Sequence, residues 1–545
     1  MTTFQLTIFA KSGGWLTKRI SLEGSSLKSD GSACVMSTGA ARRFEFSDVQ
    51  QLAARIEQLG SDEAIALGRL RPDLPDRVEV TTKRRLNGAA HPNLIARTEE
   101  FVLYQPGEPA FTLVDFDTKG MPPAVAARMV ELGGCCAALI SVLPALANVA
   151  RIERKSTSAG LYRADTREKL PGSGGEHVYL AVSDGSDNER FLRTLHARCW
   201  LAGLGWMMVG AGGQLLDRSI VDRVVGSPER LVFEGPPLLV PPLEQDKSSR
   251  GPIATDGEIL DTIAACPPLT ILEESKLREL RAREADRLAP KAAEAKKAFI
   301  DRQAEQLAVR TGVPLPQAIK VIERQCAGVL LPHIELPFDD QELAGTSVAD
   351  VLADPARFEG ATLADPLEGA EYGAGKAKIM LRADGTPWIH SFAHGRIVYS
   401  LQLDYHAAEI LLARATPGEA SDLFVRCVLY GDLGEDEIEQ LRDRASKITG
   451  AGKRSLDAKL RRTRKEYAGR QAEEQRNQRI AERRDPRPQI PLPAPDAEWL
   501  PQMQVLNDVL RNAPTAMRNT ALFTAQVHTR HIPSLHLLTT QEVNP

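Results

Sequence analysis

The sequence lacks the features that mark several large classes of protein. Its seven cysteines include no Cys-x-x-Cys pair, which argues against a zinc ribbon and against a disulfide framework. No apolar run reaches the roughly 18 residues of a membrane span, and no charged-then-apolar signal opens the chain. A net charge of −4 excludes a polycation, so any nucleic-acid contact must come from local basic patches. We therefore expect a cytoplasmic protein that makes no contact with membranes.

The chain has 545 residues, which is too many for one hydrophobic core, and 43% of them are hydrophobic. Strand-like runs such as Phe4–Ala10, Val78–Thr82 and Phe101–Tyr104 alternate with helical patterns such as Asp48–Leu59, which predicts an α/β (α+β) fold. We divide the chain into five segments: a mixed α/β unit (1–240), a linker with a long helical stretch (241–312), an accessory mixed α/β domain (313–452), a basic helix with a Pro-rich linker (453–495) and a short C-terminal segment (496–545).

Three local patterns refine this division. Residues 271–311 are rich in strong helix formers, which predicts a long helix or a helical hairpin, with an interruption near Pro290 as an open alternative. A β-hairpin is expected at Arg382–Thr386. The basic run that begins at Lys453 is most simply a solvated helix face or a tether, with binding to a phosphate backbone as the functional alternative.

Two carboxylates follow a short apolar run. The run Phe111–Val114 predicts a buried strand, and Asp115 and Asp117 follow it two positions apart. Because side chains alternate along a strand, these carboxylates project to one face and repel each other unless a cation lies between them. Hard divalent ions such as Mg²⁺ take such ligands together with substrate phosphates. The alternative is a polar strand end that leads into a turn.

A histidine follows a flexible Gly/Ser segment. Ser173 lies in this lead-in, and His177 begins a second apolar strand that runs to Val182. The glycines allow close approach of backbone to phosphates, and the histidine can donate a hydrogen bond to a triphosphate. A structurally satisfied histidine in a hairpin is the alternative.

A third carboxylate follows further along. Asp222 comes directly after the apolar pair Ile220-Val221, which suggests another strand end, and Arg230 precedes the next apolar run. Several carboxylates around a pair of divalent ions would serve phosphoryl transfer, with an arginine holding phosphate bidentately. Asp217 competes with Asp222 for this role, or caps a turn. The spacing to Arg230 favours Asp222.

Taken in order, these motifs resemble the archaeo-eukaryotic primase (primase-polymerase) superfamily, over roughly residues 90 to 240. The family pattern is a hydrophobic-Asp-x-Asp/Glu motif, a Ser-x-His motif and a hydrophobic-Asp motif on an RRM-like core. The resemblance implies that Asp115, Asp117 and Asp222 are catalytic ligands of two Mg²⁺ or Mn²⁺ ions. It also implies that His177 and Arg230 bind the incoming nucleotide.

One departure from the family pattern leaves alternatives open. Gly175 stands where the serine of Ser-x-His belongs, and Ser173, the nearest hydroxyl, is the candidate nucleotide-binding residue in its place. The resemblance implies a DNA primase or polymerase of a bacterial phage, plasmid or other mobile element, using single-stranded DNA and nucleoside triphosphates, with a replicative helicase as a further candidate partner. A non-catalytic replication-initiation protein with a relict primase fold is the first alternative, and a metal-dependent nuclease is the second.

Weaker signals lie in the accessory domain. The stretch 371–378 resembles a nucleotide-binding loop but has Ala377 at the hydroxyl position, so an ATPase is rejected and a basic DNA-contacting loop through Lys376 and Lys378 is the alternative to a plain turn. His390 and His394 are four residues apart within an aromatic run whose flanks suggest strand and turn. For these residues packing is the favoured interpretation.

Overall fold

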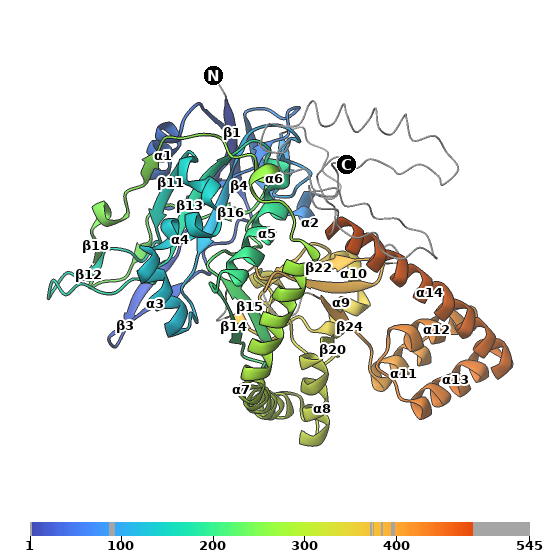
Figure 1. The fold of residues 1–545 in the computed structure, drawn as a ribbon. Coiled ribbons are helices and arrows are strands. Elements are labelled where there is room, and N and C mark those ends of the chain that lie inside the picture. Colours follow the sequence, from blue (N-terminus) through green and yellow to red (C-terminus); the bar gives the residue numbers. More distant parts are fainter. Residues whose placement is uncertain are drawn as a thin grey trace, which may run out of the picture.

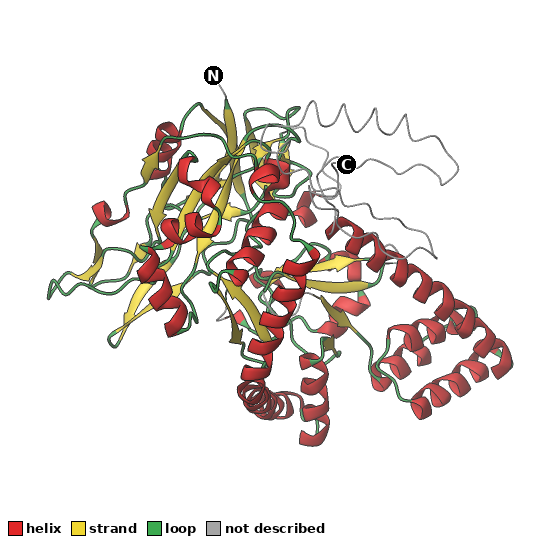
Figure 2. Ribbon diagram, in the orientation of Figure 1, coloured by secondary structure: helices red, strands yellow, loops and turns green. Residues whose placement is uncertain are grey.

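The computed structural model describes residues 3–86, 93–370, 373, 375–382, 385–393 and 398–482. Helices and strands are interleaved along the chain, and the strands form several small, mostly antiparallel sheets (Figures 1 and 2). The expected mixed α/β class is therefore confirmed. The predicted C-terminal segment 496–545 and most of the Pro-rich linker lie outside the described residues.

A six-stranded sheet forms the N-terminal part of the molecule. In spatial order its strands are β16 (Leu231–Val232), β5 (Glu63–Ala66), β1 (Phe4–Lys11), β4 (Gly39–Phe46), β7 (Arg77–Thr81) and β8 (Leu94–Ala96). Helix α1 (Val49–Glu57) begins after Asp48, whose carboxylate accepts the backbone N–H of Gln51 as an N-cap. The first two predicted strands and the first helix are confirmed within one or two residues, while the third predicted strand shortens to β9 (Val102–Leu103).

A four-stranded antiparallel sheet carries the predicted site. Its spatial order is β10 (Ala110–Phe116), β13 (Glu176–Val182), β11 (Arg151–Lys155) and β19 (Ile253–Thr255). Helices α3 (Pro123–Leu132) and α4 (Cys135–Val142) connect β10 to β11, and α5 (Asn188–Leu201) follows β13. Its buried side chains join those of β1, β4 and α1 in one hydrophobic core, in which the rings of Phe4 and Phe111 meet edge-on at 5.0 Å.

A hairpin and a long helix link this lobe to the rest of the chain. Strands β14 (Gly205–Val209) and β15 (Leu215–Ser219) pair antiparallel, and α7 (Ile271–Thr311) packs along β14 and α5. The long helix is confirmed, but it continues through Pro290 without the interruption left open above. A capping box at Thr270 and Glu273 starts it, and Pro290 lies on its exposed side, where the lost hydrogen bond leaves no buried group unsatisfied.

The accessory region contains a second sheet and a helical group. Strands β20 (Val329–Leu330), β24 (Val398–Leu401), β23 (Pro387–Ser391), β22 (Ala377–Leu381) and β21 (Thr362–Leu363) form the sheet, whose core includes α8 (Leu315–Cys326) and the end of α7. The predicted hairpin is confirmed, since β22 and β23 pair antiparallel on either side of it.

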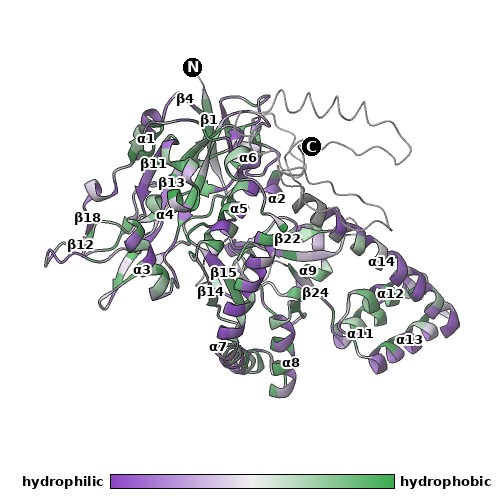
Figure 3. Cartoon of the chain, viewed as in Figure 1, coloured by the Kyte–Doolittle hydropathy of each residue, from purple (hydrophilic) through white to green (hydrophobic). Residues whose placement is uncertain are grey.

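Helices α11 (Tyr405–Ala413), α12 (Ala420–Tyr430), α13 (Glu435–Thr449) and α14 (Lys453–Glu482) pack around a separate core at one side of the molecule (Figure 1). The basic run thus forms a helix, α14, and it is largely hydrophilic in Figure 3. Within the described residues no single helix has the length and apolar composition to cross a membrane. The consecutive pair α3 and α4 reaches that threshold together, with an 87° bend between the two.

Candidate functional site

Asp115 and His177 face each other across two neighbouring strands. They are direct partners in the antiparallel register of β10 and β13, so both side chains project from the same face of the sheet. His177 Nε2 lies 3.6 Å from Asp115 Oδ1. The first and second motifs therefore meet in space.

Asp222 reaches the same strand from the other side. Its backbone N–H donates to the carbonyl oxygen of Asp115 at 3.2 Å, which places the third motif beside the first. The sequence prediction of a strand end was wrong here: β15 ends at Ser219, and Asp222 lies in the following loop. The apolar pair before it, Ile220-Val221, is fully buried and anchors this loop in the core.

The carboxylates influence one another electrostatically. Burial raises the pKa of Asp115, and the neighbouring charges of Asp222 and Asp117 raise it further, while His177 and Arg230 act in the opposite direction. Mutual repulsion of this kind is what a bound cation relieves. Asp115 nevertheless keeps a third of its side chain exposed to solvent, so a ligand can reach it.

Asp117 is the more exposed member of the first motif. It lies one residue beyond β10, and its Oδ1 accepts the backbone N–H of Lys119 at 2.9 Å. Arg218 on β15 approaches the other oxygen at 3.9 Å. Arg218 was not singled out from the sequence, because only the β14–β15 hairpin brings it to this strand end.

The donor set suits a hard divalent ion. Among the described residues, no group of three or more His, Cys, Asp or Glu side chains is placed to hold a metal ion. Mg²⁺ does not need one, because it is commonly held by one or two carboxylates plus substrate phosphates and water. The carboxylates of Asp115, Asp117 and Asp222 offer the type of oxygen donor that such an open site uses.

His177 is held from behind by a buried glutamate. Its Nδ1–H donates to Glu234 Oε1 at 2.5 Å, and the Tyr179 hydroxyl donates to the same oxygen at 2.6 Å. Glu234 follows β16 and has no exposed side-chain surface. Since an ionised carboxylate can only accept hydrogen bonds, Nδ1 carries a proton in this contact, and Nε2 is directed toward Asp115.

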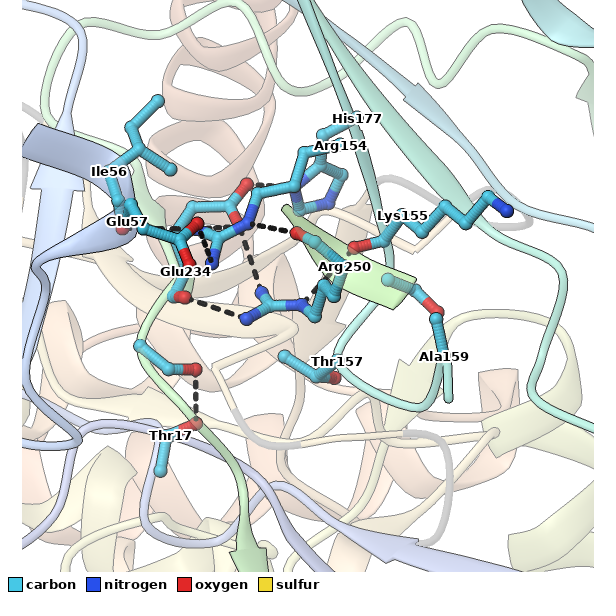
Figure 4. A network of polar contacts seen from close by, with 12 residues as sticks. Thr17, Ile56, Glu57, Arg154, Lys155, Thr157, Ala159, His177, Glu234 and Arg250 are labelled. Atoms are coloured by element: carbon cyan, nitrogen blue, oxygen red, sulfur yellow. Dashed lines mark hydrogen bonds and ion pairs between the residues drawn. The ribbon is translucent and has the colours of Figure 1, made fainter. Parts of the chain in front are cut away.

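Two buried arginines neutralise Glu234 (Figure 4). Arg154 Nη1 lies 3.2 Å and Arg250 Nη2 2.9 Å from Glu234 Oε2, and both guanidinium groups also donate to backbone carbonyls. Burial alone would raise the pKa of Glu234, but His177 and the two arginines lower it to about 2. Burial lowers the pKa of His177, and the charges of Glu234 and Asp115 outweigh this effect and raise it.

Ser173 lies beside the first motif in a cluster of hydroxyl groups. Its Oγ is 2.9 Å from that of Ser156 and 3.1 Å from that of Ser158, and its carbonyl accepts a hydrogen bond from Thr118. The lead-in turns at Gly174, whose φ of +71° favours glycine. Ser173 therefore fixes the lead-in next to Asp117, and its role toward a nucleotide stays a prediction.

Arg230 returns to the site through the loop that begins at Asp222. One of its guanidinium nitrogens donates to the carbonyl of Val224 at 3.0 Å, which holds the side chain against the loop. Its charge lowers the pKa of Asp115, as noted above. The predicted Asp222 and Arg230 pair is thus gathered on one side of β10.

Asp217 belongs to a different network. Its carboxylate accepts from Trp200 Nε1 at 2.7 Å, contacts His196 Nε2 at 3.1 Å, and pairs with Arg223 and Arg281 at 2.5 and 2.8 Å. These partners lower its pKa against the effect of burial. Asp217 thus joins β15 to α5 and α7, whereas Asp222 contacts Asp115.

Of the two histidines noted in the accessory domain, His390 is described by the structure. His390 on β23 packs edge-on against Trp388 and Phe392, with ring centroids 5.7 and 4.8 Å away, which is the packing role that the sequence favoured. His394 lies outside the described residues. Lys376 and Lys378 lie on either side of Ala377 at the start of β22. They interact electrostatically with Arg230 and Glu229 of the N-terminal lobe, which the sequence did not reveal.

Comparison of the chain with protein-family models, with curated proteins and with solved structures finds no match.

Proposed function

We propose that this chain is a metal-dependent primase-polymerase of a mobile genetic element, which joins nucleotides on a single-stranded DNA template. One observation carries the proposal: Asp115, His177 and Asp222 come from three separate motifs and meet at one end of β10. Such convergence is expected of a nucleotidyl-transfer site and is not required by packing, since carboxylates repel one another.

The order of elements around the site also supports this function. Strand β13 lies between β10 and β11, which are connected by helices α3 and α4, and α5 follows β13. This is a split β-α-β arrangement, the topology from which RRM-like cores are built. The finer assignment to the primase-polymerase superfamily rests on this topology together with the three motifs.

The proposed reaction forms one bond and breaks one. The oxygen of a primer or initiating 3′-hydroxyl attacks the α-phosphorus of a nucleoside triphosphate in line, the bond from that phosphorus to the bridging oxygen breaks, and pyrophosphate leaves with the electron pair. The hydroxyl proton passes to solvent. The protein contributes positioning and charge stabilisation, which dominate phosphoryl transfer in general.

The residues of the chain divide these tasks. Asp115, Asp117 and Asp222 would hold two Mg²⁺ or Mn²⁺ ions, whose chemistry is to neutralise phosphate charge and to activate the hydroxyl. His177, held at Nδ1 by Glu234 and favoured in its charged form by its raised pKa, would donate from Nε2–H to a phosphate oxygen. Arg230 offers a guanidinium to the same triphosphate.

Template-dependent synthesis tests the proposal. Purified protein, single-stranded DNA, Mg²⁺ or Mn²⁺ and labelled NTPs or dNTPs are expected to give short products without a primer. No product from primed or unprimed templates would contradict it. Metal-dependent binding of nucleotide then separates the outcomes, because a relict primase fold would lose it, and degradation of the template would indicate a nuclease.

A further inference from the structure

Helix α14 packs on the helical group through one side. Its side chains Leu456 and Leu460 are buried in the core that α11 to α14 share. One turn and a half further on, the ring of Tyr467 meets that of Tyr430 on α12 edge-on, with centroids 5.6 Å apart. These contacts fix the orientation of the helix, so the side that faces away from the group is also defined.

The packing also neutralises the acidic residue at the start of α14. Asp457 is the one acidic residue in the sequence between positions 453 and 465, and its carboxylate lies 3.3 Å from the guanidinium of Arg442 on α13. On the packed side, Lys459 lies 2.7 Å from Asp422 of α12. The acidic partners in this part of the helical group are therefore used between the helices.

The opposite side of α14 is basic. Because successive residues of an α-helix are about 100° apart, positions seven and eleven residues after Arg454 return to within about 20° of it, whereas the two buried leucines lie about 120° or more away. These positions are Arg461 and Lys465, and Arg462 and Arg464 flank them. All five side chains are exposed, and in the part of the chain that the structure describes none of them forms an ion pair. We call these five residues the basic face.

Packing does not account for the basic face. Like charges four residues apart, such as Arg461 and Lys465, destabilise a helix, and these side chains make no contribution to the buried core on the other side. The face lies along one edge of the helical group, where Figures 1 and 3 show α14 as a straight and largely hydrophilic helix. A ligand with regularly spaced negative charges would relieve the repulsion.

We propose that the basic face binds the phosphate backbone of double-stranded DNA, independently of base sequence. Duplex DNA is a rigid ligand that carries about one negative charge per 1.7 Å of its axis, and a helix of 30 residues is a rigid rod of about 45 Å. This inference goes beyond the proposed function and does not rest on it, because the face would bind a duplex whether or not the carboxylates of the other lobe hold metal.

The duplex is favoured over two other polyanions. Proteins that bind single strands stack bases on aromatic side chains, and the basic face has no aromatic residue, since Tyr467 packs against Tyr430 instead. Helices that bind anionic membranes insert an apolar side into the lipid, and the apolar side of α14 is already buried in the core.

Binding by the full-length protein tests the inference. The basic-face variant, Arg454→Gln/Arg461→Gln/Lys465→Gln, removes three exposed charges that make no packing contact in the core. The probes are a fluorescent DNA duplex of mixed sequence, the corresponding single strand, and vesicles of phosphatidylcholine with phosphatidylserine. Each affinity is measured over a range of salt concentrations, and circular dichroism checks that the variant is folded.

A matched control removes the same charge from another helix. Arg278, Lys291 and Lys297 are exposed cations of α7, and Arg278→Gln/Lys291→Gln/Lys297→Gln changes the net charge of the protein by the same amount. A general effect of net charge would therefore weaken DNA binding equally in the control and in the basic-face variant.

The basic-face variant is expected to bind the duplex at least about tenfold more weakly at low salt, and the slope of log affinity against log salt should fall by about two to three. The control should stay within about twofold of the wild-type protein. Unchanged duplex binding by the basic-face variant, an equal loss in the control, or a loss confined to the single strand or to vesicles would overturn the inference. None of these outcomes bears on nucleotide incorporation, which tests the proposed function separately.

Discussion

Glu234 Oε1 accepts the Nδ1–H of His177 at 2.5 Å from a position with no exposed side-chain surface. Two consequences follow from this contact. The imidazole ring has one orientation, with Nε2 toward Asp115. The stability of the lobe also depends on a carboxylate that two buried arginines neutralise, and truncating one member of such a network leaves the others uncompensated.

Glu234→Gln should therefore destabilise the N-terminal lobe by about 3 kcal/mol, the size expected when one partner of a buried ion pair is lost. Urea unfolding followed by tryptophan fluorescence measures this, because Trp200 and Trp206 are buried in that lobe. Glu294→Gln on the exposed face of α7 is the control and should change nothing. Equal unfolding midpoints for the two variants would show that the network does not contribute as described.

Substitutions of Asp217 and Asp222 should have different effects, the first on stability and the second on activity. Asp222→Asn is expected to lower nucleotide incorporation by at least about a hundredfold, since the carboxylate proposed to bind metal is lost, with little change in unfolding. Asp217→Asn should instead lower stability by about 2 kcal/mol, because Arg223 and Arg281 lose their charged partner, and should keep activity wherever it remains folded. Incorporation rates and unfolding curves of both variants are the measurement, and a reversed pattern would assign the third motif to Asp217.

The accessory domain has its own pH-sensitive contact between His333 and Asp404. His333 Nε2 lies 3.3 Å from Asp404 Oδ2, and this hydrogen bond raises the pKa of His333 above 6.5. The charged histidine is bound more tightly in the folded state, so its contribution is complete below pH 6.5 and is lost as pH rises through the folded pKa.

Thermal unfolding of the wild-type protein and of His333→Gln should therefore differ more at about pH 5.5 than at about pH 8.5. The difference should stay below about 1 kcal/mol, because the pair is partly exposed and screened by solvent. A difference that grows with pH would contradict the assigned direction.

The sequence predicted the parts of the site that depend on local pattern. The buried apolar run before Asp115 predicted one strand, and the apolar run after His177 predicted a second. Once these two strands are adjacent, the pairing of Asp115 with His177 follows from their register. Asp222 was identified by its spacing to Arg230, but its position in a loop was not predicted. The apolar pair before it is buried in that loop, and in the sequence such a pair looks like the end of a strand.

The remaining residues depend on contacts between distant segments. Glu234 is one carboxylate after a short apolar run, and nothing near it in sequence indicates His177, 57 residues away. Lys376 was predicted to be part of a basic loop, whereas its electrostatic interaction with Asp115 and Asp222 depends on how distant segments pack. Arg218 likewise depends on how the β14–β15 hairpin folds over Asp117.

The most direct test of the central claim is unprimed synthesis on single-stranded DNA by the wild-type protein, the Asp115→Ala/Asp117→Ala variant and an Asp286→Ala control. Asp286 is an exposed carboxylate on α7, away from the three motifs. Short, metal-dependent products are expected from the wild-type protein and the control, and none from the double variant, which should retain its fold by circular dichroism. Full activity in a folded double variant would contradict the assignment of these carboxylates.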